Sequence, residues 1–418
     1  MYALVDAVAF YASAEKVFDP TIRKRPVVVL TNNDGCICAT SPEARALNIP
    51  KFEPYFKLKG YLNQHNVVVR SSNYELYADL SSRMMNVIGR FCDNQYVYSI
   101  DESFLQFKGF ASLIDDWHQY GQEIRLAVWR ETKLPVGVGF GITPTLAKAA
   151  NHAAKKLEGF NGVAVIDDKH SAQAILSRMK VTDVWGIGGR LGKKLNLMRI
   201  YSAQDLANQS PKNMRKQFSV VVERTVEELN GKVCLSWDEV KQDKQEIFST
   251  RSFGNRVTDI QSLKSSLITH CAIVGKKLRQ QASLTNRLVI FAHSSPHEDK
   301  FYKRSYLYDF PVPTSDSRIL AKAVSEVLPL LFEQGVRFYK AGVGAIDLVS
   351  ERYMQEDLFT PSSDNQKLMR SIDGINRLFG KGTITLASEQ QTKQWAMKRE
   401  FLSPRYTTRW KDIPKIVC

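Results

Sequence analysis

Cysteine is scarce in this sequence, and its few copies form no recognisable pair. The 418 residues include 6 cysteines. None lies in a Cys-x-x-Cys pair, and none has a histidine at the spacing of a zinc ligand. We therefore expect reduced thiols in a reducing compartment, with neither a zinc site nor a disulfide framework.

Long apolar runs are also missing. No stretch of 18 apolar residues occurs, so we expect no membrane-spanning helix. The first ten residues have no basic segment ahead of their apolar run, which argues against a signal peptide and favours a cytoplasmic location. Apolar residues make up 44% and charged residues 24% of the chain. That balance is ordinary for globular domains and excludes disordered, collagen-like and coiled-coil chains.

Negative charge is in short supply. There are 58 lysines and arginines against 43 aspartates and glutamates, a formal net charge of +15. Such an excess favours polyanionic partners, because each neutralised phosphate releases condensed counterions. A basic surface without a specific partner is the alternative, and composition alone places nucleic acid only modestly ahead of it.

The order of the predicted elements indicates a multidomain α+β chain. Residues 1–168 mix short β-rich and helical runs, which predicts a sheet with helices over a face. Residues 171–231 hold only short helices, and a charged connector follows near residue 238. Residues 247–348 follow the order strand, helix, strand, strand, helix, strand, which is typical of a split β-α-β-β-α-β domain. From residue 351 we expect a weakly ordered tail with short helices.

Acidic residues stand where two predicted apolar strands end. Asp6 follows the run Ala3–Val5, and the pair Asp101-Glu102 follows Tyr96–Ile100. If these strands are neighbours, three carboxylates converge, and their repulsion is costly unless divalent cations neutralise it. Such oxygen ligands suit Mg²⁺, and two ions can hold the attacking and leaving oxygens of a phosphoryl transfer. A single acid at a strand end is more often merely solvated. Two acidic positions, each after an apolar strand, favour a metal site but leave the solvated alternative open.

The residues around these acids resemble a known family. The segments Asp6–Ser13 and Tyr98–Phe104 are similar to the active-site signature of the Y-family (translesion) DNA polymerases. The match is closest to the UmuC branch, which includes the catalytic subunit of bacterial DNA polymerase V. Further matching segments are Val138–Gly141, Asn151–Lys156, Trp185–Gly188 and, as in the UmuC branch, Ser403–Thr408.

The resemblance implies a right-hand polymerase with a ferredoxin-like palm, small fingers, a helical thumb, a β-α-β-β-α-β little finger and a C-terminal tail. The implied activity is that of a DNA-directed DNA polymerase: error-prone, template-directed synthesis across lesions, as in SOS mutagenesis and DNA repair. The implied limits are 1–20 and 76–169 for the palm, 21–75 for the fingers, 170–232 for the thumb, 233–245 for a linker, 246–350 for the little finger and 351–418 for a partner-binding tail.

The resemblance assigns the acids to metal binding. Asp6, Asp101 and Glu102 would be the catalytic metal ligands, and the backbone carbonyl of Ala7 would complete one of two Mg²⁺ sites. The sequence does not distinguish Mn²⁺ from Mg²⁺. The family commonly has Asn where this chain has Val8; the change removes a polar contact beside the metals, and the sequence does not tell its consequence for rate or fidelity.

The resemblance also assigns residues to the incoming deoxynucleoside triphosphate. Tyr11 matches the ring that excludes a ribose 2′-hydroxyl, whereas without the family match it is predicted to be a core residue. Arg45 lies in a helix that starts at Ser41-Pro42, and its guanidinium can hold two phosphate oxygens. Pro42 stands where the family sometimes has Tyr, so the identity of the assisting hydroxyl stays open. The predicted nucleotide-binding set is Phe10, Tyr11, Arg45 and Lys155.

A glycine-rich turn lies between two helical runs in residues 184–194. Its backbone N–H groups can hold one DNA phosphate without reading bases, although such a turn is equally often only structural. The resemblance identifies it with the helix-hairpin-helix of the thumb, and it identifies the basic face of the last domain with the little finger. The predicted contacts with primer-template DNA are Gly186, Gly188, Arg190, Lys193, Lys194, Arg251 and Arg256.

The tail contains two features that predict docking. Gln355 followed by Leu358 and Phe359 resembles a bacterial sliding-clamp-binding peptide, in which the two apolar side chains fill a pocket and the amide hydrogen-bonds at its rim. Residues 392–417 alternate aromatic and basic side chains, which indicates a binding surface. The resemblance implies contact there with a processed UmuD-like dimer and with RecA, at the bacterial nucleoid.

Two other functions fit parts of the sequence. A catalytically idle DNA-binding scaffold shares the basic surface but has no need for Asp6, Asp101 and Glu102 as unpaired carboxylates. A nucleotide cyclase shares a sheet with paired metal acids but has no duplex to hold, so the basic thumb and little finger argue against it. The polymerase is the prediction that uses all of these features.

Overall fold

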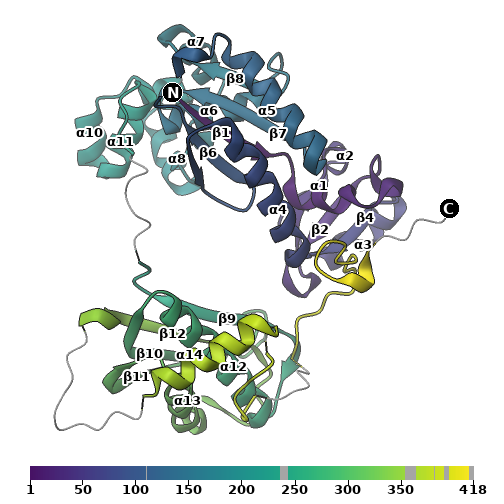
Figure 1. Ribbon diagram of the computed structural model, residues 1–418, viewed down its shortest axis with the longest axis vertical. Coiled ribbons are helices and arrows are strands. Elements are labelled where there is room, and N and C mark those ends of the chain that lie inside the picture. Colours follow the sequence, from purple (N-terminus) through teal and green to yellow (C-terminus); the bar gives the residue numbers. More distant parts are fainter. Residues whose placement is uncertain (110, 236–242, 354–363, 381, 390–394, 414–418) are drawn as a thin grey trace. The chain divides into compact units, whose positions relative to one another are not determined.

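The chain folds into two units, and one of them is formed by two separate stretches of the sequence (Figure 1). Unit 1 comprises Met1–Val240 and Glu400–Cys418, and unit 2 comprises Lys241–Arg399. The chain therefore crosses from unit 1 to unit 2 and returns near its C-terminus. This computed structural model describes residues 1–109, 111–235, 243–353, 364–380, 382–389 and 395–413. No helix in those ranges is both long and apolar enough to cross a membrane.

A five-stranded sheet forms the centre of unit 1, with β1 as its middle strand. Both neighbours of β1 run antiparallel to it. Alternate β1 residues face opposite cores: Ala3 and Val5 pack with helices α4 (Tyr74–Ile88) and α5 (Trp117–Thr132), and Leu4 packs with Ala147 of helix α6. Both faces are covered, which explains the continuous apolar run. The strand order is β5 (Asn94–Val97), β6 (Glu102–Gln106), β1 (Tyr2–Ala7), β7 (Val136–Gly141), β8 (Val163–Ile166).

Helix α6 (Pro144–Lys156) lies very close to β7, because alternate glycines of the strand face it. A Cβ atom at Gly139 would lie 2.0 Å from the backbone nitrogen of Asn151. The side-chain amide of Asn151 donates to the carbonyl oxygens of Leu4 (3.1 Å) and Gly137 (2.8 Å). The glycines and this amide together fix α6 over the middle of the sheet.

We expect Gly139→Ala to destabilise the protein, because the added methyl group would meet the backbone of α6 and not a movable side chain. Overpacking of this kind costs about 1–3 kcal/mol of folding free energy. A lower midpoint of urea unfolding would show this loss. Gly60 in α3 (Tyr55–Gln64) faces open space, so Gly60→Ala is the matched control and should leave the midpoint unchanged or raise it. Equal stability of Gly139→Ala and the parent would contradict the close contact between β7 and α6.

The acidic pair Asp101-Glu102 lies at the start of a strand, and the prediction that it ends one was wrong. Strand β5 stops at Val97, the chain reverses, and Glu102 is the first residue of β6. The reversal is stabilised by the Ser99 hydroxyl, which accepts from the backbone N–H groups of Asp101 (3.3 Å) and Glu102 (3.1 Å). The acids still lie beside Asp6, because β6 pairs antiparallel with β1.

The region predicted as fingers contains a three-stranded sheet with the order β3 (Ile37–Thr40), β2 (Val27–Leu30), β4 (Val68–Ser71). Helix α2 (Pro42–Ala46) begins as the sequence predicts, with the Ser41 hydroxyl accepting from the N–H of Ala44 at 3.3 Å. The sequence did not predict α3 or β4. Helix α3 buries only Leu62, so it lacks the apolar face that makes a helix recognisable.

The region predicted as thumb is built from short helices, as expected. Glycine at 186 has a φ of +87°, a conformation that favours glycine, and it precedes the turn into α8. The helices are α7 (Lys169–Leu176), α8 (Gly189–Leu197), α9 (Ala203–Ala207), α10 (Pro211–Gln217) and α11 (Val220–Leu229).

Unit 2 confirms the predicted β-α-β-β-α-β order. Its sheet has the strand order β11-β10-β12-β9, and α12 and α13 share a core with it. Along β10, Leu288 and Ile290 are buried in that core, whereas Arg287, which precedes Leu288 on the strand, is exposed. The elements are β9 (Ile247–Val257), α12 (Ile260–Gln280), β10 (Ser283–His293), β11 (Lys303–Thr314), α13 (Ser317–Leu331) and β12 (Phe338–Ser350).

The described part of the tail is packed, and the expectation of weak order was wrong for residues 364–380 and 395–413. Helix α14 (Gln366–Leu378) is tied to α12 by the ion pair of Asp373 with Arg279 at 2.7 Å. Trp395 is buried in the core of unit 2, beside Phe253. The buried apolar residues of the tail are too far apart in sequence to form a periodic pattern, so its composition alone suggested weak order.

Candidate active site

A cavity of about 420 Å³ in unit 1 brings together most of the predicted catalytic and nucleotide-binding residues. It lies where β1 and α1 (Phe10–Val17) meet the region predicted as fingers and the end of α6. Glu102 is not among the lining residues. The lining residues are Asp6, Ala7, Val8, Ala9, Phe10, Tyr11, Cys38, Ala39, Arg45, Lys51, Ile100, Asp101, Lys155 and Lys156.

Three acidic residues lie around the end of β1. Asp6 lies directly opposite Glu102 in the β1–β6 pair, and the backbone N–H of Ala7 donates to the carbonyl of Asp101 at 2.9 Å. The Asp101 carboxylate accepts a hydrogen bond from the Ser99 hydroxyl at 2.6 Å. The strand pairing meets the condition stated from the sequence, that the two acidic segments are neighbours.

Two lysines of α6 hold two of the acids. Lys155 forms an ion pair with Asp6, and the Lys148 ammonium lies 3.1 Å from a carboxylate oxygen of Glu102. Lys148 also lies over the rings of Tyr98 (4.6 Å) and Trp185 (5.1 Å). The two lysines are seven positions apart and so share a helix face, a spacing from which the sequence analysis could have identified Lys148.

The electrostatics of the acids favour a cation. Burial raises the pKa of Asp6 to about 6; Lys155 opposes that shift, and the neighbouring Glu102 and Asp101 add to it. Within the described ranges, no three His, Cys, Asp or Glu side chains are gathered closely enough to hold a metal ion. Oxygen donors that repel one another nevertheless fit a hard divalent cation, because its charge turns their repulsion into attraction.

The cavity also contains cations that the sequence analysis missed. Lys51 and Lys156 line it together with the predicted Arg45 and Lys155. Burial, and then the positive charge of the neighbouring Arg45, lower the pKa of Lys51. The group is therefore suited to a polyphosphate.

Tyr11 is half-buried at the start of α1, with its ring in the cavity. It stacks on Tyr77 of α4, with ring centroids 4.6 Å apart and planes at 15°, and Tyr74 meets it edge-on at 6.1 Å. Phe10 is 3% exposed, and its ring meets that of Tyr77 edge-on with centroids 6.3 Å apart. Ala9, which precedes α1, has a φ of +50°, so the chain turns sharply between the strand with Asp6 and the helix with Tyr11.

The two departures from the family pattern lie in different places. Val8 lines the cavity, and its backbone N–H donates to the carbonyl of Pro135 at 2.8 Å. Pro42 lines a separate cavity, with Lys16 and Trp129 among its neighbours. Nothing in the structure explains the change to Val at position 8.

The predicted DNA contacts lie in both units. Gly188 precedes α8, and Arg190, Lys193 and Lys194 on that helix are exposed. The two little-finger residues do not share one environment. Arg251 is exposed, whereas Arg256 lies 3.6 Å from Glu298 and over the ring of Tyr339. The predicted clamp-binding residues Gln355, Leu358 and Phe359 lie outside the described residues.

Three family models match the chain. The impB/mucB/samB family model matches residues 5–152, the C-terminal domain model of the same family matches residues 244–358, and a domain described as being of unknown function matches residues 366–416. The described active-site residues Asp6, Tyr11 and Asp101 fall inside the first match.

Relatives of the same length support this assignment. Protein UmuC of Salmonella typhimurium is 43% identical over 100% of both chains, and protein MucB of Escherichia coli is 38% identical over 99% of both. Among solved structures, a Y-family DNA polymerase chimera of Dbh and Dpo4 has a TM-score of 0.63 at 18% identity, over 84% of this chain and 99% of that chain. An insertion ternary complex of Dbh DNA polymerase has a TM-score of 0.55 at 18% identity, with the same coverage.

The structural likeness confirms the predicted right-hand fold, and the sequence identity over the whole chain confirms the branch. The chain belongs to the impB/mucB/samB family, the UmuC branch of the Y-family translesion DNA polymerases.

Proposed function

We propose that this chain synthesises DNA across lesions by two-metal-ion nucleotidyl transfer in the cavity described above. The observation that carries the proposal is the pairing of β1 with β6, which sets Asp6 opposite Glu102 with Asp101 next to it. The proposed ligands of two Mg²⁺ ions are these three carboxylates and the carbonyl of Ala7. When bound, the ions supply positive charge to the oxygens of the transferred phosphate.

The cations around the cavity are proposed to position the triphosphate. Arg45 and Lys51 come from the segment around α2, and Lys155 and Lys156 come from the end of α6. A polyphosphate between them relieves their mutual repulsion. Lys155 is paired with Asp6 in this structure. If Asp6 held a metal ion, the Lys155 ammonium group would be available to bind a phosphate oxygen.

Tyr11 is proposed to exclude ribonucleotides. Its ring stacks on Tyr77 and meets Tyr74 edge-on, so it cannot move aside for a 2′-hydroxyl without disturbing the buried Tyr77. Phe10 contacts both Tyr11 and Tyr77. This arrangement favours a role in sugar selection over a role in the core alone.

The remaining assignments also stay proposals. Primer-template DNA is proposed to contact the N-terminal end of α8 through Gly186, Gly188, Arg190, Lys193 and Lys194, and unit 2 through Arg251 and Arg256. A sliding clamp is proposed to bind the segment with Gln355, Leu358 and Phe359, and a processed UmuD-like dimer and RecA are proposed to bind the tail, at the bacterial nucleoid. The domain limits predicted from the sequence likewise remain predictions.

Primer extension tests the function directly. We expect the protein to extend a primer on both undamaged and abasic templates when Mg²⁺ is present, and to lose all extension when EDTA is added. Because the partner dimer is proposed to support activity, the assay is run with and without it. Tight DNA binding without extension under every one of these conditions would favour the idle scaffold over the polymerase.

A further inference from the structure

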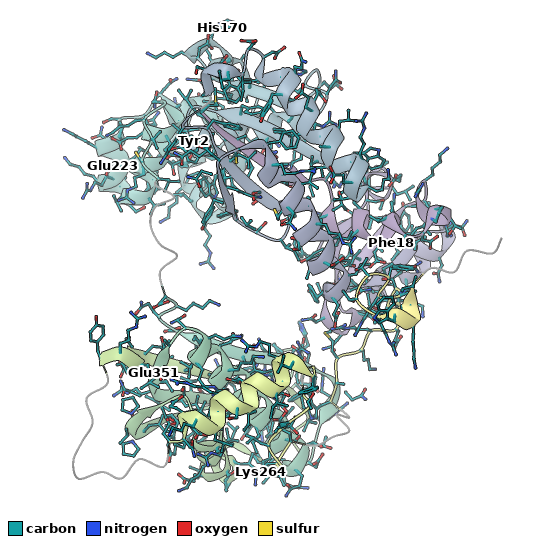
Figure 2. All side chains as sticks on the ribbon, in the orientation of Figure 1. Tyr2, Phe18, His170, Glu223, Lys264 and Glu351 are labelled. Atoms are coloured by element: carbon teal, nitrogen blue, oxygen red, sulfur yellow. The ribbon has the colours of Figure 1, made fainter. Side chains whose placement is uncertain are left out.

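The C-terminal segment of residues 400–413, here called the docked segment, lies against the region predicted as fingers (Figure 1). The backbone N–H of Ser71 at the end of β4 donates to the carbonyl of Phe401 at 3.0 Å, and the Phe401 N–H donates to the Ser71 hydroxyl at the same distance. Tyr406 stacks on Phe18, which Figure 2 labels, with ring centroids 5.0 Å apart. The segment is therefore held at several points along its length.

Ser403 is the most deeply inserted polar residue of the docked segment. It is 6% exposed, and its hydroxyl accepts from the side-chain amide of Asn73 at 2.9 Å and donates to Glu15 at 3.1 Å. The same amide donates to the Ser403 carbonyl at 3.1 Å. Asn73 is fully buried and also caps α4, so the segment completes the hydrogen bonds at the start of that helix.

Glu15 joins the docked segment to Tyr77. It is 2% exposed, and one of its carboxylate oxygens accepts from both the Tyr77 hydroxyl at 2.7 Å and the Ser403 hydroxyl. Arg70 is a charged neighbour of Glu15, with its guanidinium 3.7 Å from the other carboxylate oxygen. A buried carboxylate needs such donors, because each lost donor leaves acceptor capacity unsatisfied away from water.

Two helices carry this chain of contacts to the nucleotide cavity. On α1, Tyr11 and Glu15 are four positions apart and share a face. On α4, Asn73 and Tyr77 have the same spacing across the helix start. The fully buried Tyr77 bridges the helices: its hydroxyl bonds Glu15, and its ring stacks on Tyr11.

We propose that the docked segment positions Tyr11 through Ser403, Glu15 and Tyr77, and so sets the selection of deoxyribonucleotides over ribonucleotides. The inference rests on the proposed role of Tyr11 in sugar exclusion. It gives a function to part of the region matched as a domain of unknown function. Ser403 is a positioning residue, because it lies against Glu15 and not against the nucleotide cavity.

The effect should be confined to sugar selection. The docked segment contacts α1, α4 and β4, whereas the acids lie on β1, on β6 and in the turn before β6, and the lysines that pair with Asp6 and Glu102 lie on α6. Loss of the Ser403 hydroxyl therefore removes support from the Tyr77 ring without touching the acids. A less firmly held Tyr11 still lies in the cavity but yields more easily to a 2′-hydroxyl.

The experiment measures kcat/KM for single insertions of matched deoxy- and ribonucleotides by the full chain. We expect Ser403→Ala and Tyr77→Phe each to lower the ratio of the two values about tenfold, mainly through faster ribonucleotide insertion. Deoxynucleotide insertion by Ser403→Ala should stay near the parent value. The double mutant should lose no more selectivity than either single mutant, because both act through Glu15.

The controls separate this inference from folding and from the proposed function. Ser371→Ala removes an exposed hydroxyl that donates to the Lys367 carbonyl of its own helix, and it should leave the ratio unchanged. If Ser403→Ala and Tyr77→Phe keep the parent ratio, or slow both nucleotides equally, the inference is overturned. Tyr11→Ala is measured in parallel: loss of selectivity in that variant alone keeps the proposed role of Tyr11 and rejects the role of the segment, whereas an unchanged ratio in it rejects the role of Tyr11 itself.

Discussion

Asp101→Asn is expected to abolish primer extension while leaving DNA binding intact. The substitution removes one negative charge from the proposed metal site but keeps a side-chain oxygen that can accept from Ser99, so the turn before β6 is preserved. Loss of one preorganised electrostatic group at a reacting centre costs about 10²–10³ in rate, and loss of a metal ligand should cost at least that. Single-turnover insertion measures the rate, and fluorescence anisotropy with labelled primer-template measures DNA affinity.

Asp115→Asn is the matched control for this prediction. Asp115 is exposed and lies before α5, away from the cavity, so the same chemical change should leave extension at the parent rate. Extension by Asp101→Asn at the parent rate would refute the two-metal assignment. A parallel loss of DNA affinity would instead show that the acid supports the fold of the palm.

Tyr11→Ala is expected to produce the largest change in substrate choice. Removing the ring opens the space that a ribose 2′-hydroxyl needs, and selection by exclusion is lost when the excluding group is removed. We expect the deoxy-to-ribo ratio of kcat/KM to fall about a hundredfold, which corresponds to about 2.8 kcal/mol. Single-nucleotide insertion with both sugars at the same template base measures this ratio.

Tyr353→Ala serves as the control for the loss of a tyrosine ring. Tyr353 is 87% exposed in unit 2, so its removal should leave the sugar preference unchanged. An unchanged preference in Tyr11→Ala would return Tyr11 to the role of a core residue that supports Tyr77.

The elements that the sequence predicted well are those whose signal is local. The apolar run before Asp6 is buried on both faces and forms β1, and the Ser41-Pro42 pair begins α2 by a hydrogen bond within one helical turn. The alternation of strands and helices in unit 2 follows from periodicities of two and 3.6 residues. In each case neighbours in sequence are also the physical partners.

The errors have a common physical cause as well. Tyr96–Ile100 was predicted to be one strand because its residues favour strands, but the Ser99 hydroxyl stabilises a turn within that stretch. Helix α3 and strand β4 were missed because the first has almost no buried face and the second has only two buried residues, at its ends. Local pattern is weak wherever burial by other segments decides the structure.

The sequence by itself determined the family, the two acidic segments and the split domain of unit 2, because these depend on motifs and on local periodicity. Only the tertiary structure placed Lys148 beside Glu102 and Ser403 beside Glu15. Ser403 and Glu15 are 388 positions apart, and their hydrogen bond forms because the chain returns from unit 2 to unit 1. No local propensity encodes such a contact. It forms because buried polar groups need hydrogen-bond partners, and in the folded chain a distant segment provides them.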